Sequence, residues 1–495
     1  MALKQRSTRV GLVLVFTVLG FLVMGYHPGL EDDGIYLAAV KASLNPALFP
    51  HNSAFFRMQT QATVFPWWMA HFAAATHMSI AWSELLWQII ALFAILWACH
   101  GIARRLFDEP CAMWAGVALV AAMFTLPVTG TALYLVDQHL HPRTLATACI
   151  LLAVERIMTG RRWQAAPLLL LAFLFHPIMA ALGISFCVFL ALAILEPAPA
   201  WLRFRRGRGS SLAAAAVPLA WVFAPANAGW RMALDTRTYY FLYKWTWYEW
   251  LGALAPLFLF WLLWRVARRR EETRLARFAL AVFAYGVFQQ CIAFLMLTPP
   301  ALVRLTPWQP MRYLHLVYFF LVLLAGCLLG KYLLKNRLWL WAIFLVVFNG
   351  GMLVSQLMEY SASPHLEMPW TQSSNPWLQA FAWVRRNTPV DAYFALNPSY
   401  LAAPGEDRHG FRALAERSQL ADAIKDAAVV TQIPELGPVW ERQVDAQKGW
   451  PGFRLEDFER LKTEFGVDWV VVSYPQPAGL ICRWHNRSLA VCQIP

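Results

Sequence analysis

Long apolar segments alternate with short clusters of arginine and lysine over most of this chain of 495 residues. Hydrophobic residues make up 59% of the sequence and charged residues only 14%, whereas about a quarter of the residues of a soluble domain are charged. Basic residues in short loops beside apolar spans mark the cytoplasmic side of a membrane protein. The sequence therefore predicts a polytopic membrane protein. The basic clusters are Lys4/Arg6/Arg9, Arg104/Arg105, Arg161/Arg162, Arg203/Arg205/Arg206/Arg208, Arg268 to Arg270 with Arg274, and Lys331/Lys335/Arg337.

The net charge of +13 has the same origin, because the basic residues lie mainly in these short loops. In a soluble protein such a charge would suggest a nucleic-acid partner, but here it is a topology signal, and we predict no nucleic-acid binding. The chain has no Walker motif, no dinucleotide glycine fingerprint and no serine elbow. Nucleotide-driven or soluble-cofactor chemistry therefore has no support in the sequence.

The basic clusters also predict the topology of the spans. The apolar run Val10 to Met24 has no small-residue cleavage site after it, so it is predicted to be an uncleaved anchor with a cytoplasmic N-terminus. Keeping every later cluster inside gives about eleven transmembrane helices, some of them short. This arrangement breaks the long run Trp163 to Leu195 into two short helices at His176-Pro177, and it makes Ala62 to His77 an interfacial or re-entrant helix. The predicted spans are 10–26, 80–102, 111–128, 144–158, two within 163–195, 211–226, 250–265, 275–297, 312–330 and 338–357.

The composition changes after Tyr360, where the chain becomes charged and rich in proline. We predict a transmembrane domain over residues 1–357 and a small extracytoplasmic α/β domain over residues 358–495, long enough to bury its own core. Its predicted helices are 377–386 and 455–464, and its predicted strands are 392–396, 469–473 and 489–492. The richness in alanine, arginine and tryptophan suits a bacterial inner membrane with this domain in the periplasm.

Two of the eight cysteines lie in the predicted extracytoplasmic domain. Cys482 and Cys492 flank a turn-like segment, and a disulfide between them would persist in an oxidising compartment. The other six lie in or beside apolar spans without CxxC spacing and are predicted to be small core residues.

Three adjacent carboxylates, Glu31, Asp32 and Asp33, follow the first span in a predicted outer loop. Because like charges repel, at least one is expected to have a raised pKa or a cationic partner. The alternative is a structural role, in which the acidic residues cap the helix that begins near Ile35. We consider all three as candidate catalytic groups.

Histidines and arginines recur in the other predicted outer loops. His139, His141 and Arg143 lie in one loop, and Arg304 and Arg312 lie in another. Arginine at the outer membrane surface opposes the positive-inside trend, so we predict that these residues bind a lipid phosphate. The alternative is that the arginines extend to the headgroups of ordinary lipids.

A metal site is conceivable from His27, Asp32, Asp33, His139 and His141. These residues come from separate loops, and no HxxxH or HExxH spacing supports the site. We predict no resident cofactor, with a divalent cation left as an open alternative.

An acidic first loop after span one, an interfacial segment, many spans with short ones among them, and a C-terminal outer α/β domain together resemble the GT-C superfamily of membrane glycosyltransferases. His141-Pro142-Arg143, His176-Pro177 and Gln309 to Arg312 also resemble segments of uncharacterised bacterial membrane proteins near that superfamily.

The resemblance implies transfer of a sugar from a polyprenyl-phosphate carrier to an acceptor on the outer face of the cytoplasmic membrane. It further implies that Asp32 or Asp33 is the general base and that Arg143 and Arg312, assisted by His139 or His141, hold the departing phosphate. The predicted partners are membrane lipids and the polyprenyl-linked donor; the sequence does not predict an oligomeric state. The competing classes are a transporter or flippase for a lipid-linked or anionic substrate, and a non-catalytic membrane scaffold.

Overall fold

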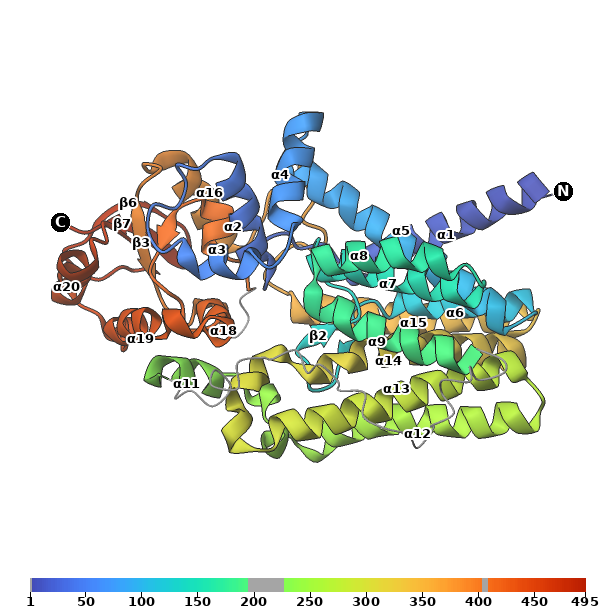
Figure 1. Cartoon of the computed structure of the whole chain (residues 1–495). Helices are drawn as coiled ribbons and strands as arrows, with labels where there is room; N and C mark the ends of the chain where they lie inside the picture. The colour runs from blue at the N-terminus through green and yellow to red at the C-terminus, as the bar shows by residue number, and fades with distance from the viewer. Residues whose placement is uncertain (1, 195–226, 403–407) are drawn as a thin grey trace.

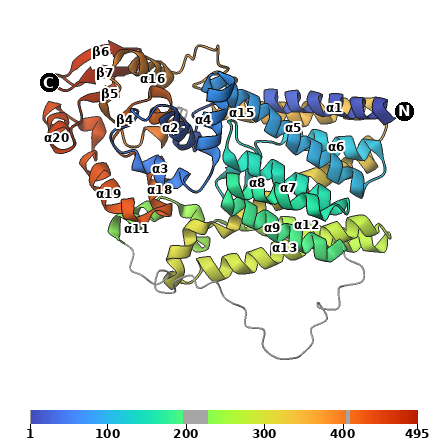
Figure 2. The same cartoon turned by 45° about the horizontal axis from the view of Figure 1, so that its top comes forward.

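The computed structural model describes residues 2–194, 227–402 and 408–495. Most of these residues are helical. The long helices run side by side in a bundle, and a smaller unit that contains a β-sheet lies at one end of it (Figures 1 and 2).

Seven helical segments among the described residues are long and apolar enough to cross a membrane. A crossing of roughly 30 Å needs about 20 apolar residues, so the chain is a multi-pass membrane protein. The seven are α1 (Ala2–Met24), α5 (Ile80–Leu106), α9 (Pro177–Ile194), α12 (Trp247–Arg269), α13 (Thr273–Leu297), the segment Pro310–Leu334 that contains α14 (Tyr313–Leu329), and α15 (Leu338–Glu359).

Three shorter helices complete the described bundle: α6 (Pro110–Ala122), α7 (Pro142–Met158) and α8 (Ala165–Phe175). The predicted break at His176-Pro177 is confirmed, because α8 ends at Phe175 and α9 begins at Pro177. Proline lacks the N–H that a continuous helix requires. The predicted span at 211–226 and the basic cluster Arg203 to Arg208 lie outside the described residues.

Three basic loops meet at one end of the bundle, here called the basic end. Arg274 pairs with Asp108 across 3.1 Å, which joins the α12–α13 turn to the α5–α6 turn. Lys331 lies 2.8 Å from Glu272, which joins the loop after α14 to the same group. The C-terminal unit lies at the opposite end, here called the domain end (Figure 1).

Short elements fill the domain end of the bundle. The predicted interfacial segment forms the short helix α4, which lies across the direction of the long helices in both views (Figures 1 and 2). These elements are α2 (Asp33–Leu44), α3 (Ala54–Thr60), α4 (Phe65–Thr76), the hairpin β1 (Pro127–Val128) and β2 (Leu133–Tyr134), and α11 (Ala228–Asp235). Short 3-10 turns are η1 (Arg162–Gln164), η3 (Thr238–Tyr240), η4 (Leu242–Lys244), η5 (Pro300–Trp308), η6 (Pro310–Arg312), η8 (Tyr400–Ala402), η9 (Pro434–Leu436) and η10 (Trp450–Gly452), and η7 (Gly330–Leu334) is a π-helical turn.

The C-terminal unit contains a five-stranded mixed sheet in the order β4-β3-β5-β7-β6. β4, β3 and β5 are parallel, with Phe394 opposite Trp469, and β7 is antiparallel to β5 and β6. Alternate residues of β3 face opposite sides: Phe394 packs with α16 residues, whereas Tyr393 packs with α20 residues. Its elements are α16 (Pro376–Asn387), β3 (Tyr393–Leu396), α17 (Phe411–Ala415), β4 (Ser418–Gln419), α18 (Lys425–Gln432), α19 (Gly437–Ala446), α20 (Leu455–Phe465), β5 (Trp469–Ser473), β6 (Ile481–His485) and β7 (Leu489–Gln493).

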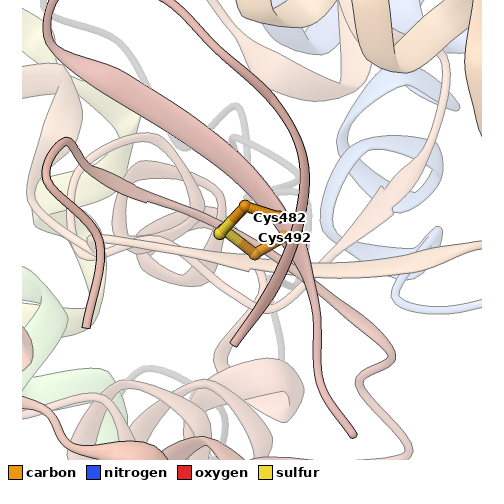
Figure 3. The surroundings of a disulfide bond; sticks show 2 residues. All are labelled: Cys482 and Cys492. Carbon is orange, nitrogen blue, oxygen red and sulfur yellow. A yellow bond between two sulfur atoms is a disulfide. The ribbon is translucent and has the colours of Figure 1, made fainter. Parts of the chain in front are cut away.

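The predicted helices and strands of this unit are all present, each within about two residues of its predicted bounds. The predicted disulfide is also present (Figure 3), because Cys482 and Cys492 lie opposite each other on β6 and β7. β4, β6 and α17 to α19 were not predicted, because these elements are short or show only weak alternation of apolar and polar residues.

Segments from the bundle complete the packing of the C-terminal unit. Phe55 of α3 and Trp230 of α11 share one buried cluster with Val430 of α18 and Trp440 of α19. The indole N–H of Trp230 donates to the carbonyl of Thr431 across 3.1 Å. An apolar cluster of its own, distinct from the core of the long helices, therefore joins these short elements to the C-terminal unit.

Candidate functional site

A cavity of about 760 Å³ lies between the domain end of the bundle and the C-terminal unit. This volume is within the range of roughly 300–1,000 Å³ that is usual for small-molecule sites. Its walls come from the loop after α1, α2, α3, the β1–β2 hairpin, the loop before α7, the α8–α9 junction, η3, η6, and residues of the C-terminal unit.

The three carboxylates of the first loop have different positions. Glu31 and Asp32 line the cavity, whereas Asp33 does not. Asp33 is fully buried, and its Oδ2 accepts the backbone N–H of Gly29 across 2.6 Å. Asp32 makes no capping hydrogen bond to α2. Asp33 thus has a structural role, although it fixes the loop at Gly29 and does not cap α2, whereas the Asp32 carboxylate faces the cavity.

Lys425, the first residue of α18, reaches into the same acidic loop. Its Nζ lies 2.9 Å from Oδ1 of Asp32 and also pairs with Glu31. Arg408 pairs with Glu31 across 2.8 Å. Burial alone would raise the pKa of Asp32, but the charge of Lys425, followed by that of Arg143, outweighs it and holds this pKa well below the ordinary value. Asp32 is therefore ionised at neutral pH.

The start of α7 positions Arg143 beside Asp32. His141 caps the helix, because its Nδ1 accepts the backbone N–H of Arg143 across 2.9 Å, and Pro142 occupies the first turn. The guanidinium of Arg143 is held by Asp137 in two hydrogen bonds of 2.7 and 3.2 Å. Its Nη1 lies 4.0 Å from Oδ2 of Asp32. The predicted base and the predicted phosphate ligand thus face one cavity.

Three buried histidines line the cavity next to Arg143. The ring centroids of His139 and His141 are 6.0 Å apart, and those of His141 and His176 are 6.3 Å apart. Within the described residues, neither ring nitrogen of His139 and not Nε2 of His141 has a hydrogen-bond partner. Buried polar atoms rarely lack partners in native proteins, so these nitrogens are available to a ligand.

Arg312 enters the cavity from the turn that precedes α14. Its backbone N–H closes this turn on Gln309, whose amide in turn donates to the hydroxyl of Tyr240 across 2.7 Å. Within the described part of the chain, no carboxylate lies within ion-pair distance of Arg312, and its Nε has no hydrogen-bond partner. Arg312 is thus a cavity cation whose charge is not neutralised by a neighbouring acid.

Arg304 and His315 do not line the cavity. The guanidinium of Arg304 lies over the ring of Trp230, 5.7 Å from its centroid. His315 is fully buried and contacts the carbonyl of Leu135 across 2.9 Å. Arg304 lies on η5 and Arg312 on η6, and of these two predicted phosphate ligands only Arg312 lines the cavity.

Sequence reasoning missed Arg237, Arg408 and Lys425, which all line the cavity. Lys425 and Arg408 belong to a segment whose composition is that of an ordinary α/β domain, and Arg237 follows α11 in a loop. No local pattern distinguishes these residues from surface cations. Only their packing against the first loop and the bundle reveals them.

Among the described residues that line the cavity, cations outnumber carboxylates. Five of these side chains are arginine or lysine and three are carboxylates: the cations are Arg143, Arg237, Arg312, Arg408 and Lys425, and the acids are Glu31, Asp32 and Asp137. The excess among these described residues is two positive charges when the histidines are counted as neutral. A partly desolvated site of this kind favours an anion.

Comparison with protein-family models and with curated proteins finds no match to this chain. The site must therefore be interpreted from its own geometry.

Proposed function

We propose that the protein is a membrane glycosyltransferase that moves a sugar from a polyprenyl-phosphate carrier to an acceptor. The observation that carries this proposal is the single cavity that Asp32 shares with Arg143 and Arg312, with 4.0 Å between Asp32 and Arg143. Glycosyl transfer from a lipid phosphate needs a base for the acceptor hydroxyl and cations for the phosphate that leaves, close to one another.

The topology that goes with this proposal puts the basic end in the cytoplasm and the domain end in the periplasm of a bacterial inner membrane. The positive-inside rule supports the first assignment. The Cys482–Cys492 disulfide supports the second, since disulfides persist in oxidising compartments. The proposed topology has about eleven transmembrane spans and a cytoplasmic N-terminus.

In the proposed reaction, the acceptor oxygen attacks the anomeric carbon as the bond from that carbon to the phosphate oxygen breaks. The bonding electron pair leaves with the phosphate, and Arg143 and Arg312 stabilise the added negative charge. The acceptor proton passes to Asp32 and then to solvent or to the departing phosphate. A low pKa does not disable Asp32, because the acceptor oxygen becomes acidic once its bond to carbon forms.

Lys425 is a positioning residue in this scheme. It holds the Asp32 carboxylate across 2.9 Å and keeps it ionised before the substrate binds. When the donor phosphate enters, Arg143 gains an anionic partner next to Asp32. The histidines at 139 and 141 can donate further hydrogen bonds to phosphate oxygens.

Binding of polyprenyl monophosphate tests the phosphate site without knowledge of the sugar. We expect the purified protein to bind this lipid, measured by quenching of tryptophan fluorescence in detergent. Arg312→Met should weaken binding about 10- to 100-fold, since a hydrogen bond to a charged group contributes about 1.5–3 kcal/mol. Arg231→Met, at an exposed position of α11, is the matched control. Equal affinities for wild type and Arg312→Met would refute the phosphate site.

Transfer of radiolabelled sugar from a polyprenyl-phosphate donor tests the base. Asp32→Asn should keep or improve lipid binding, because it removes a negative charge beside Arg143, yet it should lower turnover by about 10²- to 10⁴-fold. Full turnover in Asp32→Asn would remove the proposed base. Ion-dependent flux of the lipid across proteoliposomes, with no transfer product, would instead indicate the competing transporter.

A further inference from the structure

Two histidines and a glutamate meet behind the cavity wall, where the first loop, the linker after α15 and the C-terminal unit come together. His27 Nδ1 lies 3.2 Å from Oε1 of Glu367, and His409 Nε2 lies 3.0 Å from Oε2 of the same carboxylate. The side chains of His27, Glu367 and His409 are 0, 10 and 1% exposed. None of the three lines the cavity, so this group is separate from the proposed catalytic site.

The backbones that carry these residues are hydrogen bonded to one another. Glu367 donates its N–H to the carbonyl of Tyr26 across 2.8 Å, and Tyr26 donates its own to that of His365 across 3.0 Å. On the other side, Gly410 donates to Gly29 across 2.8 Å. The three segments are therefore fixed immediately beside the side chains in question. Such support positions ligands before an ion binds.

The donor set is that of a zinc site, and its three ligand atoms need only a small inward movement to reach zinc spacing. One ligand atom from each residue can be chosen so that all three lie within 4.8 Å of one another. Tetrahedral zinc with bonds of about 2.0–2.1 Å to nitrogen or oxygen places its ligand atoms roughly 3.3 Å apart. His27 Nδ1 and His409 Nε2 lie 3.2 and 3.0 Å from different oxygens of the Glu367 carboxylate, so each imidazole is already near the ligand spacing from one of its two oxygens. Two imidazoles with one carboxylate are a donor set that zinc favours.

We propose that His27, Glu367 and His409 bind one Zn²⁺, with water in the fourth position. The ion would join the end of α1 to the linker and to the C-terminal unit. It would also support the cavity from behind, because His27 donates its backbone N–H to Gln138 across 2.8 Å and Arg408 precedes His409. Because the three side chains are buried and none lines the cavity, the ion would hold these segments together, and this role does not depend on the proposed transfer reaction.

Metal content provides the first test. The protein, purified without a histidine tag and equilibrated with micromolar free Zn²⁺, should contain about one zinc per chain by mass spectrometry after gel filtration. His409→Ala and Glu367→Gln should each lose that zinc. His485→Ala, an exposed histidine of the same unit, should retain it. A wild-type protein without zinc, or variants that all keep it, would overturn the site.

Cobalt binding to the wild type provides a second test, and its absorption spectrum does not depend on the folding of a variant. Co²⁺ added to the metal-free wild type should give the visible absorption of tetrahedral coordination with nitrogen and oxygen ligands, and Zn²⁺ should abolish it. Zn²⁺ should also raise the melting temperature of the wild type but not of Glu367→Gln. No cobalt spectrum, together with unchanged melting in Zn²⁺, would show that Glu367 only accepts hydrogen bonds from two histidines.

Discussion

The three neighbouring carboxylates of the first loop differ because each has a different environment. Asp33 turns into the protein and accepts the N–H of Gly29, whereas Glu31 and Asp32 meet the cations of the C-terminal unit. Glu31 adopts a left-handed backbone conformation, with φ of 52°, just before this divergence. Asp33 and Asp32 are the same residue type, so their different roles, structural acid and proposed base, come from their positions relative to distant segments.

Removal of Lys425 should shift the pH dependence of transfer. A base must be deprotonated, so activity is lost as the pH falls through its pKa. Because Lys425 is the largest of the effects that lower the pKa of Asp32, Lys425→Met should raise this pKa and move the acidic limb of the kcat/KM profile to higher pH. Lys425→Arg, which keeps the charge, should leave the limb near that of the wild type. An unchanged profile in Lys425→Met would contradict the role of Asp32 as base.

The buried pair Arg412 and Asp426 should be a main determinant of the stability of the C-terminal unit. Two hydrogen bonds of 2.7 and 2.9 Å join them, and their side chains are 7 and 0% exposed. Arg412→Met leaves a buried charge without its partner, so the free energy of unfolding should fall by about 3–5 kcal/mol. Pulse proteolysis in urea would measure the loss.

The control for that measurement is Arg442→Ala. Arg442 pairs with Glu464 at an exposed site, where the arginine side chain is 66% accessible. Surface pairs contribute roughly 0–1 kcal/mol, so this variant should unfold almost as the wild type does. An equal decrease in the free energy of unfolding in both variants would mean that the buried pair stabilises the unit no more than a surface pair does.

At the scale of elements, α11 and α19 approach each other closely enough that only glycine fits between them. A Cβ atom at Gly229 would lie 2.3 Å from the carbonyl oxygen of Gly437. Gly229→Ala should therefore push the two helices apart and lower stability by about 1–3 kcal/mol, despite the better helix propensity of alanine. Nano-differential fluorimetry should show a lower melting temperature, with Gly452→Ala, where the added atom meets nothing within 4 Å, as the control.

The β6–β7 hairpin should be covalently closed. Thiol reagents should modify neither Cys482 nor Cys492 in the native protein, and should modify both after reduction, because the two residues form a disulfide across a separation of 10 residues. Closing a loop of this length stabilises by about 2–3 kcal/mol in the chain-entropy model. The double variant Cys482→Ser/Cys492→Ser should melt at a lower temperature, and ready labelling of both cysteines without reductant would exclude the bond.

For the whole molecule, the separation of basic end and domain end makes the topology testable. In a background without the six free cysteines, Lys448→Cys in the C-terminal unit should react with a membrane-impermeant maleimide in intact cells, since its side chain is 69% exposed. Arg270→Cys, in the α12–α13 turn, should react only after the cells are permeabilised. The reverse pattern would place the cavity on the cytoplasmic side.

Features that depend on local composition could be predicted from the amino-acid sequence. Apolar length and basic loops predicted a multi-pass helical bundle with a break at His176-Pro177, and alternation of apolar residues predicted the main strands of the C-terminal unit. These features follow from the free energy of moving side chains out of water and from backbone geometry, which are properties of short segments.

Which charged groups meet depends on how distant segments of the chain pack together. Lys425 and Asp32 are 393 residues apart in sequence, and His27 meets Glu367 and His409 only because backbone bridges align three distant segments. The fold also places Arg312 but not Arg304, and Asp32 but not Asp33, on the cavity wall. The physical reason is that an ion pair or a ligand set depends on the packing of whole elements, and no period or spacing along the chain encodes the partner of a single side chain.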